Sequence, residues 1–289
     1  MLIRSMVRNL LLFCAGVLLT LPRVCAQELP LLACPSSKPG LQTGKYAGYA
    51  VRLSPSSKRG ERCQALVTAP VSKASQAKTV ARDWALSINR LSGSDINGDG
   101  KPELIVQGYS GGAHCCYTYR IISLSGGLPL VREIHDQVPV LFVRRDDGST
   151  EIHAGDGVFD YFLLPHADSV IPQIFLRLNG DKLVDVSGEH VAEYDKRIEK
   201  AHSELGAADL DKLRKSTYNQ NMLYDQLPTV QKVLVIVLNY LYSGRDDQAW
   251  QALGEMWPPT DVERVKKLIL ERRSRGLLSQ VAQKSEAGS

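Results

Sequence analysis

The stretch that decides the fold is residues 94–123, SDINGDGKPELIVQGYSGGAHCCYTYRIIS. It contains two apolar runs rich in β-branched and aromatic residues, 103–108 and 115–122, which are typical of strands. The glycines between these runs indicate a turn that joins them as a hairpin. A loop in which oxygen-bearing side chains occupy alternate positions precedes the first run. The stretch therefore predicts two paired strands that follow a loop suited to bind a cation.

Short runs of the same kind recur from residue 27 to residue 187. They are residues 46–53, 62–68, 138–143, 149–153, 157–163 and 174–178. Asp146-Asp147-Gly148 and Asn179-Gly180 are turn sequences that predict two further hairpins. Residues 73–89 are ambiguous and are compatible with an initial helix. Strands of this length and spacing predict an antiparallel meander, a sandwich or a propeller-like sheet.

The composition changes after residue 187. Residues 189–275 are rich in Leu, Ala, Glu, Lys and Arg and have apolar residues at helical spacing. Residues 230–242, VQKVLVIVLNYLY, are apolar on nearly every face, which predicts a buried helix. Residues 241–259 resemble the helical hairpin of a tetratricopeptide repeat, but no 34-residue period recurs elsewhere, so we expect a single helical hairpin packed on the rest.

The predicted fold class is therefore α+β, with an antiparallel β domain at residues 27–187 and a helical domain at residues 188–283. Residues 284–289 are polar, and we expect a disordered tail there.

Residues 1–26 have the pattern of a secretory signal peptide. Arg4 and Arg8 precede the apolar residues 10–21, and Val24-Cys25-Ala26 offers a cleavage site before Gln27. Twelve apolar residues are too few to cross a bilayer as a helix, which needs about 20. The pattern predicts a periplasmic or secreted protein with no transmembrane span after cleavage. The alternatives are an uncleaved anchor and a lipoprotein box at residues 31–34.

The charge balance argues against a nucleic-acid partner. The chain of 289 residues has 35 Lys+Arg and 31 Asp+Glu, a formal net charge of +4. Residues 1–26 hold three of the arginines and no acid, so the net charge falls to +1 after cleavage. A polyanion-binding surface needs a clear basic excess. We expect the partner to be an unknown protein or glycan ligand.

Four cysteines remain after cleavage: Cys34, Cys63, Cys115 and Cys116. An even number in an oxidising compartment predicts disulfides. Adjacent residues of a strand point to opposite faces, so we expect the 115–116 pair to bridge to Cys34 and Cys63. The alternatives are a Cys34–Cys63 bridge with a vicinal ring or free thiols, and metal binding by residues 114–116.

The loop at residues 94–104 predicts a Ca²⁺ site. Asp95, Asn97 and Asp99 supply side-chain oxygens at alternate positions, Lys101 offers its backbone carbonyl, and Glu103 adds a carboxylate. Ca²⁺ takes six to eight oxygen ligands, and the three acids repel one another unless a cation lies between them. The alternative is an ordinary Asn-Gly/Asp-Gly turn with solvated acids.

This spacing differs from an EF-hand, whose twelfth position is Glu, because Val106 stands there and a strand follows. Ligands at positions 1, 3, 5, 7 and 9 that run into a strand resemble the calcium loops of FG-GAP/VCBS repeats, the blades of integrin-α-like β-propellers. The resemblance implies a structural Ca²⁺ held by Asp95, Asn97, Asp99, the Lys101 carbonyl and Glu103. It occurs once in the chain. Residues 110–119, SGGAHCCYTY, resemble uncharacterised exported bacterial proteins, which implies no activity.

A serine hydrolase is the alternative function. Residues 108–112 match G-x-S-x-G, with Ser110 as the nucleophile, and downstream acids and histidines are available to complete a triad: Asp156, Asp160, His166 and His190. A nucleophile elbow must lead into a helix, whereas residues 113–123 are typical of a strand. We therefore expect a non-catalytic, exported Ca²⁺-binding module of structural or ligand-binding role. A strand at residues 112–122 supports this hypothesis, and a helix supports the hydrolase.

Overall fold

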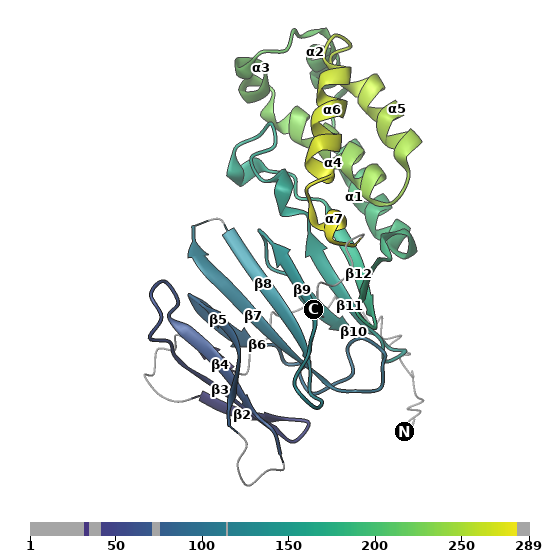
Figure 1. The fold of residues 1–289 in the computed structure, drawn as a ribbon. Coiled ribbons are helices and arrows are strands. Elements are labelled where there is room, and N and C mark those ends of the chain that lie inside the picture. Colours follow the sequence, from purple (N-terminus) through teal and green to yellow (C-terminus); the bar gives the residue numbers. More distant parts are fainter. Residues whose placement is uncertain (1–31, 35–41, 71–75, 114, 282–289) are drawn as a thin grey trace, which may run out of the picture.

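The computed structural model describes residues 32–34, 42–70, 76–113 and 115–281. Strands occupy residues 32–185 and helices residues 187–281, so the predicted α+β class is confirmed (Figure 1). The predicted signal peptide and the predicted tail at residues 284–289 lie outside the described residues. Within the part of the chain that is described, no helix is both long enough and apolar enough to span a membrane.

The strands form three sheets, in which every pair is antiparallel. The first sheet has the order β2 (Gln42–Tyr46), β3 (Tyr49–Pro55), β4 (Cys63–Thr68), β5 (Lys78–Asp83). The central sheet has the order β1 (Leu32–Cys34), β6 (Ala85–Ile88), β7 (Glu103–Gly112), β8 (Cys115–Ser123), β9 (Leu130–Asp136). The third sheet has the order β10 (Leu141–Arg144), β11 (Thr150–Gly155), β12 (Gln173–Asn179), β13 (Lys182–Asp185). Apart from β1, which pairs with β6, neighbouring strands within each sheet are consecutive in the chain, as in a meander.

Some local predictions are confirmed and others are wrong. The turns at 146–148 and 179–180 join β10 to β11 and β12 to β13 as expected. Residues 46–53 are not one strand, because the chain reverses between Tyr46 and Tyr49, which pair across a tight turn. Residues 157–163 are not a strand either: they contain the short 3-10 helix η1 (Gly157–Phe159) and an irregular segment. The ambiguous residues 76–89 form β5 and β6 and no helix.

The central sheet is buried on both faces. Side chains alternate along a strand, so Leu104 and Val106 join the core shared with the first sheet. Ile105 joins the core shared with the third sheet and the helices. All three side chains are fully buried. Burial of apolar surface contributes about 25 cal/mol per Å² to the free energy of folding. Because β7 contributes buried side chains to both cores, it connects them.

The helical region begins directly after the third sheet. Its elements are η3 (Ser187–His190), α1 (Val191–Ser203), α2 (Ala207–Lys215), α3 (Gln220–Asp225), α4 (Leu227–Tyr242), α5 (Asp246–Met256), α6 (Val262–Arg273) and α7 (Leu277–Val281). The helix predicted at residues 230–242 is α4, which contacts α1, α2, α3, α5 and β12. Its apolar side chains are buried as expected. The turn at residues 243–245 leads into α5, so α4 and α5 form the predicted helical hairpin.

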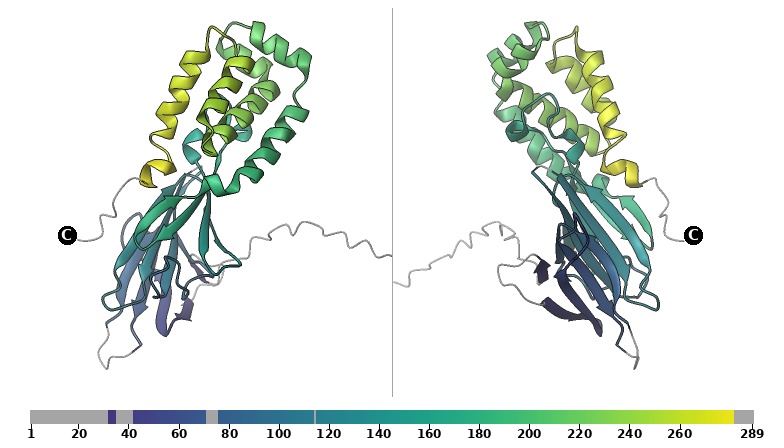
Figure 2. Two further views of the ribbon diagram at one scale, coloured as in Figure 1. Left: turned by 90° about the vertical axis from the view of Figure 1, so that its right-hand side faces the viewer. Right: turned by 60° about the vertical axis from the view of Figure 1, so that its left-hand side comes forward.

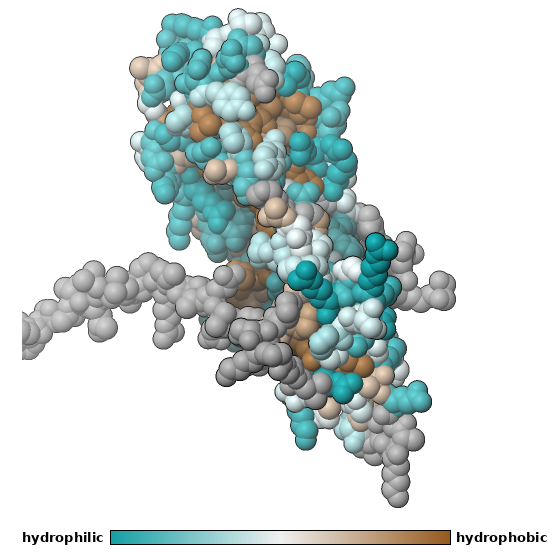
Figure 3. Space-filling model, turned by 90° about the vertical axis from the view of Figure 1, so that its left-hand side faces the viewer, coloured by the Kyte–Doolittle hydropathy of each residue, from teal (hydrophilic) through white to brown (hydrophobic). Residues whose placement is uncertain are grey.

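The helices stand at one end of the sheets (Figure 2). In the view of Figure 3 hydrophilic residues cover most of the helical region, and hydrophobic residues are visible between the helices. The last helix, α7, returns to the strands and contacts β9 and β13. The core of the helical region is therefore continuous with the core of the third sheet.

The disulfide pairing corrects the preferred prediction. Cys34 in β1 bonds to Cys63 in β4, and not to residue 115 or 116. This bridge links the central sheet to the first sheet beside their shared core, where Cys63 is fully buried. Cys116 is also disulfide-bonded, and its partner lies outside the side chains that the structure describes. The prediction failed because β1 and β4 meet through packing of sheets, which cysteine spacing does not encode.

Two buried carboxylates lie where the sheets meet the helical region. Asp156 follows β11; it accepts hydrogen bonds from the Tyr242 hydroxyl at 2.5 Å and from the Leu277 amide at 3.0 Å. Asp136 ends β9 and accepts from the amides of Gln137 and Val138. Burial raises the pKa of Asp136 to about 7, although these amides oppose the rise, and the charge of Asp156 adds to it.

The Asp136 carboxyl should make folding depend on pH. It ionises near 3.8 in an unfolded chain and at about 7 in the folded protein, so its stabilising contribution is complete below pH 3.8 and is lost as the pH rises through 7. Asp136→Asn stays neutral. Its free energy of unfolding, measured in urea relative to the unsubstituted protein, should increase by about 2–3 kcal/mol between about pH 5 and about pH 8. The exposed Asp146→Asn is the control, and a difference that does not vary with pH would contradict this prediction.

Candidate functional site

The predicted calcium loop is a closed turn held by its own side chains. Asp95 accepts hydrogen bonds from the backbone amides of Gly98 at 2.7 Å and Gly100 at 2.9 Å, one on each carboxylate oxygen. Asn97 accepts from the Asp99 amide, and Asp99 accepts from the Lys101 amide. Gly100 has a φ of +83°, which favours glycine. The loop therefore bends the chain so that successive Asx side chains lie on its inner side.

Glu103 closes this loop from the first position of β7. Its side chain is fully buried, and Oε2 accepts a hydrogen bond from the Ile96 amide at 2.7 Å. The other oxygen, Oε1, is buried and has no hydrogen-bond partner. Burial raises the pKa of Glu103 to about 7, and the negative charges of Asp99 and Asp95 raise it further against the Ile96 and Asn97 amides. The Glu103 carboxylate thus lacks a compensating positive charge.

The loop is also anchored to the third sheet. The Arg144 guanidinium, at the end of β10, donates to the Asp95 carbonyl at 3.0 Å. The Gly180 amide, in the turn between β12 and β13, donates to the Asn97 carbonyl at 2.9 Å. Both hairpins predicted from the turn sequences therefore contact the predicted calcium loop. The structure brings all five expected ligand residues into one turn between the central and third sheets.

The described residues contain no group of three or more His, Cys, Asp or Glu side chains arranged to hold a metal ion. The expected ligand set contains three such side chains, those of Asp95, Asp99 and Glu103, and they do not form such a group. Asp95 and Asp99 direct oxygens to backbone amides. A carboxylate has about four acceptor positions, so these hydrogen bonds leave further lone pairs on the same oxygens.

The alternative hydrolase hypothesis requires a nucleophile elbow at Ser110, and the chain does not form one there. Ser110 lies within β7, and β8, a strand and not a helix, follows the turn. The Ser110 hydroxyl accepts a hydrogen bond from the Cys116 amide at 2.8 Å across the hairpin. A nucleophile elbow needs the N-terminus of a helix at this point to form its oxyanion hole. We therefore do not propose hydrolysis by Ser110.

Two of the other residues considered for a triad lie together: Asp160 is 2.8 Å from the Nδ1 atom of His166, and both line a hollow beside the β7–β8 hairpin. The remaining two are engaged elsewhere. Asp156 is bound to Tyr242 and Leu277, and His190 contacts Glu151.

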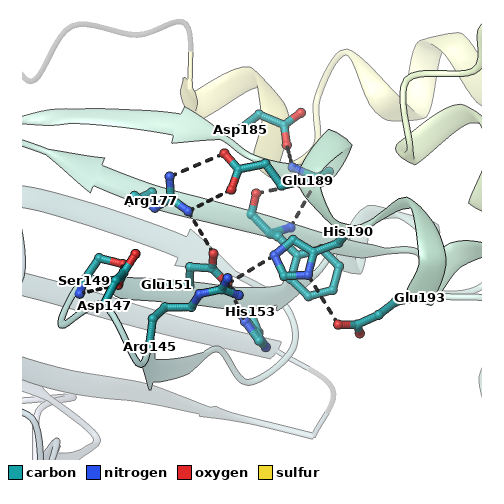
Figure 4. A network of polar contacts seen from close by, with 12 residues as sticks. Arg145, Asp147, Ser149, Glu151, His153, Arg177, Asp185, Glu189, His190 and Glu193 are labelled. Carbon is teal, nitrogen blue, oxygen red and sulfur yellow. Dashed lines mark hydrogen bonds and ion pairs between the residues drawn. The ribbon is translucent and has the colours of Figure 1, made fainter.

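A second polar cluster, which sequence patterns did not reveal, is centred on Glu151 of β11 (Figure 4). The Glu151 side chain is fully buried. Arg177 lies opposite it on the neighbouring strand β12, with a guanidinium nitrogen 2.9 Å from Oε1 of Glu151. Three further nitrogen atoms lie 3.2 Å from Oε2; they belong to Arg145, His153 and His190. Glu151 and His153 share one face of β11 because they are two residues apart. This alternation is the one sequence signal that was available.

The cluster joins the third sheet to the first residues of the helical region. Burial tends to raise the pKa of Glu151, but hydrogen bonds from His153 and Arg177 and the charges of His190 and Arg145 outweigh it, so the pKa is lowered. The His190 ring stacks on Phe175 at 3.8 Å between centroids, and its Nδ1 atom lies 3.3 Å from Glu193. The cations around Glu151 make this a structural ion cluster.

Loss of the Glu151 charge should be costly. Glu151→Gln removes the buried charge that pairs with Arg145 and Arg177, whose side chains are 42% and 31% exposed. The charge-assisted hydrogen bonds are lost with it, so we expect the free energy of unfolding at neutral pH to fall by about 1.5–3 kcal/mol. Since the pKa of Glu151 is lowered, its contribution is present above its unfolded value of 4.5 and is lost as the pH falls below it.

The matched control is Glu189→Gln, the exposed second partner of Arg177, for which we expect a loss below about 1 kcal/mol. Urea unfolding at neutral and acidic pH measures both variants. Equal losses in the two variants would show that the buried position of Glu151 carries no special weight.

Comparisons with known proteins identify no family for this chain. No protein-family model, curated protein or solved structure matches it. The FG-GAP/VCBS resemblance of residues 95–103 therefore stays a prediction, and any function has to be argued from the geometry and chemistry of the described residues.

Proposed function

We propose that this chain is an exported, non-catalytic module that binds Ca²⁺ in the 95–103 loop and recognises a protein or glycan ligand. The ion would take side-chain oxygens of Asp95, Asn97, Asp99 and Glu103 and the carbonyl oxygen of Lys101. Bound Ca²⁺ is a hard cation that supplies charge compensation and geometric constraint, and it suits a donor set made only of oxygens. Its role would be structural.

The observation that carries the proposal is the Glu103 carboxylate. A buried ionised carboxylate without a paired cation is costly, and such groups are normally neutralised or coordinate a metal. Glu103 Oε1 has no partner among the described residues, while Asp95 and Asp99 add negative charge beside it. A simple solvated turn would not require a fully buried acid at its base. A divalent cation compensates all three charges at once.

The place of the loop explains what the ion would stabilise. Arg144 and Gly180 tie the loop to two hairpins of the third sheet, and Glu103 begins the central strand β7. An ion bound here would hold these elements in register. Sites of this extracellular kind have dissociation constants of about 10⁻⁴–10⁻³ M, which fits a permanent clip in a Ca²⁺-rich compartment better than a signalling switch.

Export is the second part of the proposal. The Cys34–Cys63 disulfide indicates an oxidising, extracytoplasmic environment. Together with the signal-peptide pattern of residues 1–26, it supports a periplasmic or secreted protein.

Calcium should stabilise the protein. At tenfold saturation, binding to the folded state alone adds about 1.4 kcal/mol, which corresponds to a rise of roughly 3–6 °C in melting temperature for a chain of this size. Asp95→Ala combined with Asp99→Ala should abolish the rise between chelator and millimolar Ca²⁺, measured by differential scanning calorimetry. Asp146→Ala combined with Asp147→Ala removes two acids from another glycine turn and should keep the full rise.

The variant Glu103→Gln distinguishes a structural Ca²⁺ site from an ordinary turn without a bound ion. The neutral amide removes a buried charge, so this variant should be more stable than the unsubstituted protein in chelator and should gain little from Ca²⁺. A melting temperature that is the same with Ca²⁺ and with chelator in the unsubstituted protein would overturn the calcium proposal.

A further inference from the structure

A hollow of about 230 Å³ lies beside the β7–β8 hairpin, at the end of β7 opposite the predicted calcium loop. Tyr109 and Tyr117 form one wall, and the segment between β11 and β12 forms another through Asp160 and His166. Val138, Pro139 and Ile171 supply apolar surface, and Gln137 and Ser169 supply polar groups. Small-molecule sites typically combine apolar and aromatic walls with a few convergent polar groups.

The imidazole of His166 is held in place from two sides. Both carboxylate oxygens of Asp160 approach Nδ1, at 2.8 and 2.9 Å. Because a carboxylate only accepts, Nδ1 carries the proton, and Nε2 is an acceptor in the neutral ring. The Tyr161 ring stacks on the imidazole, with 5.4 Å between centroids and planes 28° apart. The Asp160–His166 pair is therefore held in a fixed orientation on the wall of the hollow.

Backbone strain maintains this arrangement. Tyr161 has a φ of +56°, a conformation that costs an aromatic residue free energy and occurs often at functional sites. Its amide donates to Asp160 at 3.0 Å and to the Ser169 hydroxyl at 2.9 Å. The strained turn is therefore what places the Tyr161 ring over His166 and orients the Asp160 carboxylate. Tyr161 itself is 55% exposed, whereas Phe159 and Phe162 beside it are buried in the core.

The aromatic wall continues into a second hollow. Tyr109 and Tyr117 pair across β7 and β8, with ring centroids 5.1 Å apart, and Trp84 meets Tyr109 edge-on at 6.2 Å. A hollow of about 370 Å³ is lined by Trp84 and by the same two tyrosines. Gly111 is required here, because a Cβ atom would lie 2.8 Å from the Trp84 ring. The two hollows therefore share the tyrosine pair Tyr109 and Tyr117 as a common wall, and this arrangement suits an extended ligand.

The chemistry of the lining selects the ligand. None of the described residues that line the two hollows is lysine or arginine. The Arg62 guanidinium lies over the Trp84 ring, 4.5 Å from its centroid, whereas the described lining of the His166 hollow supplies no cation to a phosphate or a carboxylate. Sugar rings expose C–H groups on their faces and hydroxyls around their edges. Aromatic rings offer apolar faces for the former, and Gln137, Ser169, His166 and Asp160 can exchange hydrogen bonds with the latter.

We propose that the Trp84–Tyr109–Tyr117 surface binds a neutral oligosaccharide, with one sugar unit in the His166 hollow and the next beyond the tyrosine pair. This inference names the ligand of the proposed binding module. It does not depend on the calcium loop, which lies at the other end of β7.

The test is a calorimetric titration of the full mature chain with maltohexaose, cellohexaose and N-acetylchitohexaose, in Ca²⁺ and in chelator. We expect at least one hexasaccharide to bind. Tyr117→Ala and His166→Ala should each weaken binding at least tenfold, since aromatic anchors dominate such sites, whereas Tyr224→Ala, an exposed tyrosine on α3, should leave binding unchanged. Tyr117→Trp keeps an aromatic face and should retain binding if Tyr117→Ala fails to fold.

Three results would overturn the inference. They are the absence of heat with every hexasaccharide at several millimolar, saccharide binding that both Tyr117→Ala and His166→Ala leave intact, and displacement of the saccharide by tetramethylammonium or inorganic phosphate. Displacement by tetramethylammonium would identify an aromatic site for cations instead. Saccharide binding without any effect of Ca²⁺ on the melting temperature would support this inference and contradict the calcium proposal. A Ca²⁺-dependent melting temperature without saccharide binding would support the calcium proposal and contradict this inference.

Discussion

Burial of β7 on both faces is the constraint on which the rest of the structure depends. Leu104 and Val106 face one core and Ile105 faces the other, so no register of this strand leaves either side to water. The first sheet, the third sheet and the helices are arranged to cover these two faces. The Cys34–Cys63 disulfide then connects two layers that already share a core.

The same constraint draws polar groups into the interior. Glu103 is the first residue of β7 and is fully buried with it, which is why a turn made of ordinary loop residues acquires a charge without compensation. The molecule treats its buried acids in different ways. Glu151 is surrounded by arginine and histidine nitrogens. Asp156 accepts a hydrogen bond from a tyrosine hydroxyl, and burial raises the pKa of Asp136. Glu103 and Asp136 each have an unpartnered oxygen and a raised pKa. Glu103 differs in its place at the end of a loop that holds two further acids, Asp95 and Asp99.

The two proposed sites lie at opposite ends of β7. The loop before the strand would hold Ca²⁺, and the aromatic surface near its end would bind a neutral glycan. The first residues of the strand between them are buried on both faces, which suits a binding module whose ligand surface must keep its shape. The absence of a helix after Ser110, where β8 follows instead, is consistent with a hairpin used as a binding edge.

Local patterns in the sequence were sufficient for the α+β class, the hairpins at 146–148 and 179–180, the buried helix α4 and the oxygen-rich loop, because turn chemistry and side-chain periodicity act over a few residues. They were not sufficient for the pairing of Cys34 with Cys63, for the ion cluster around Glu151 or for the hollow that Asp160 and His166 line together with the tyrosines of β7 and β8. These features join residues far apart in the chain, and their positions follow from which sheet faces pack together. The irregular segment after Gly157 shows the same limit, since its apolar residues favour a strand locally while the tertiary structure places Tyr161 in a strained turn over His166.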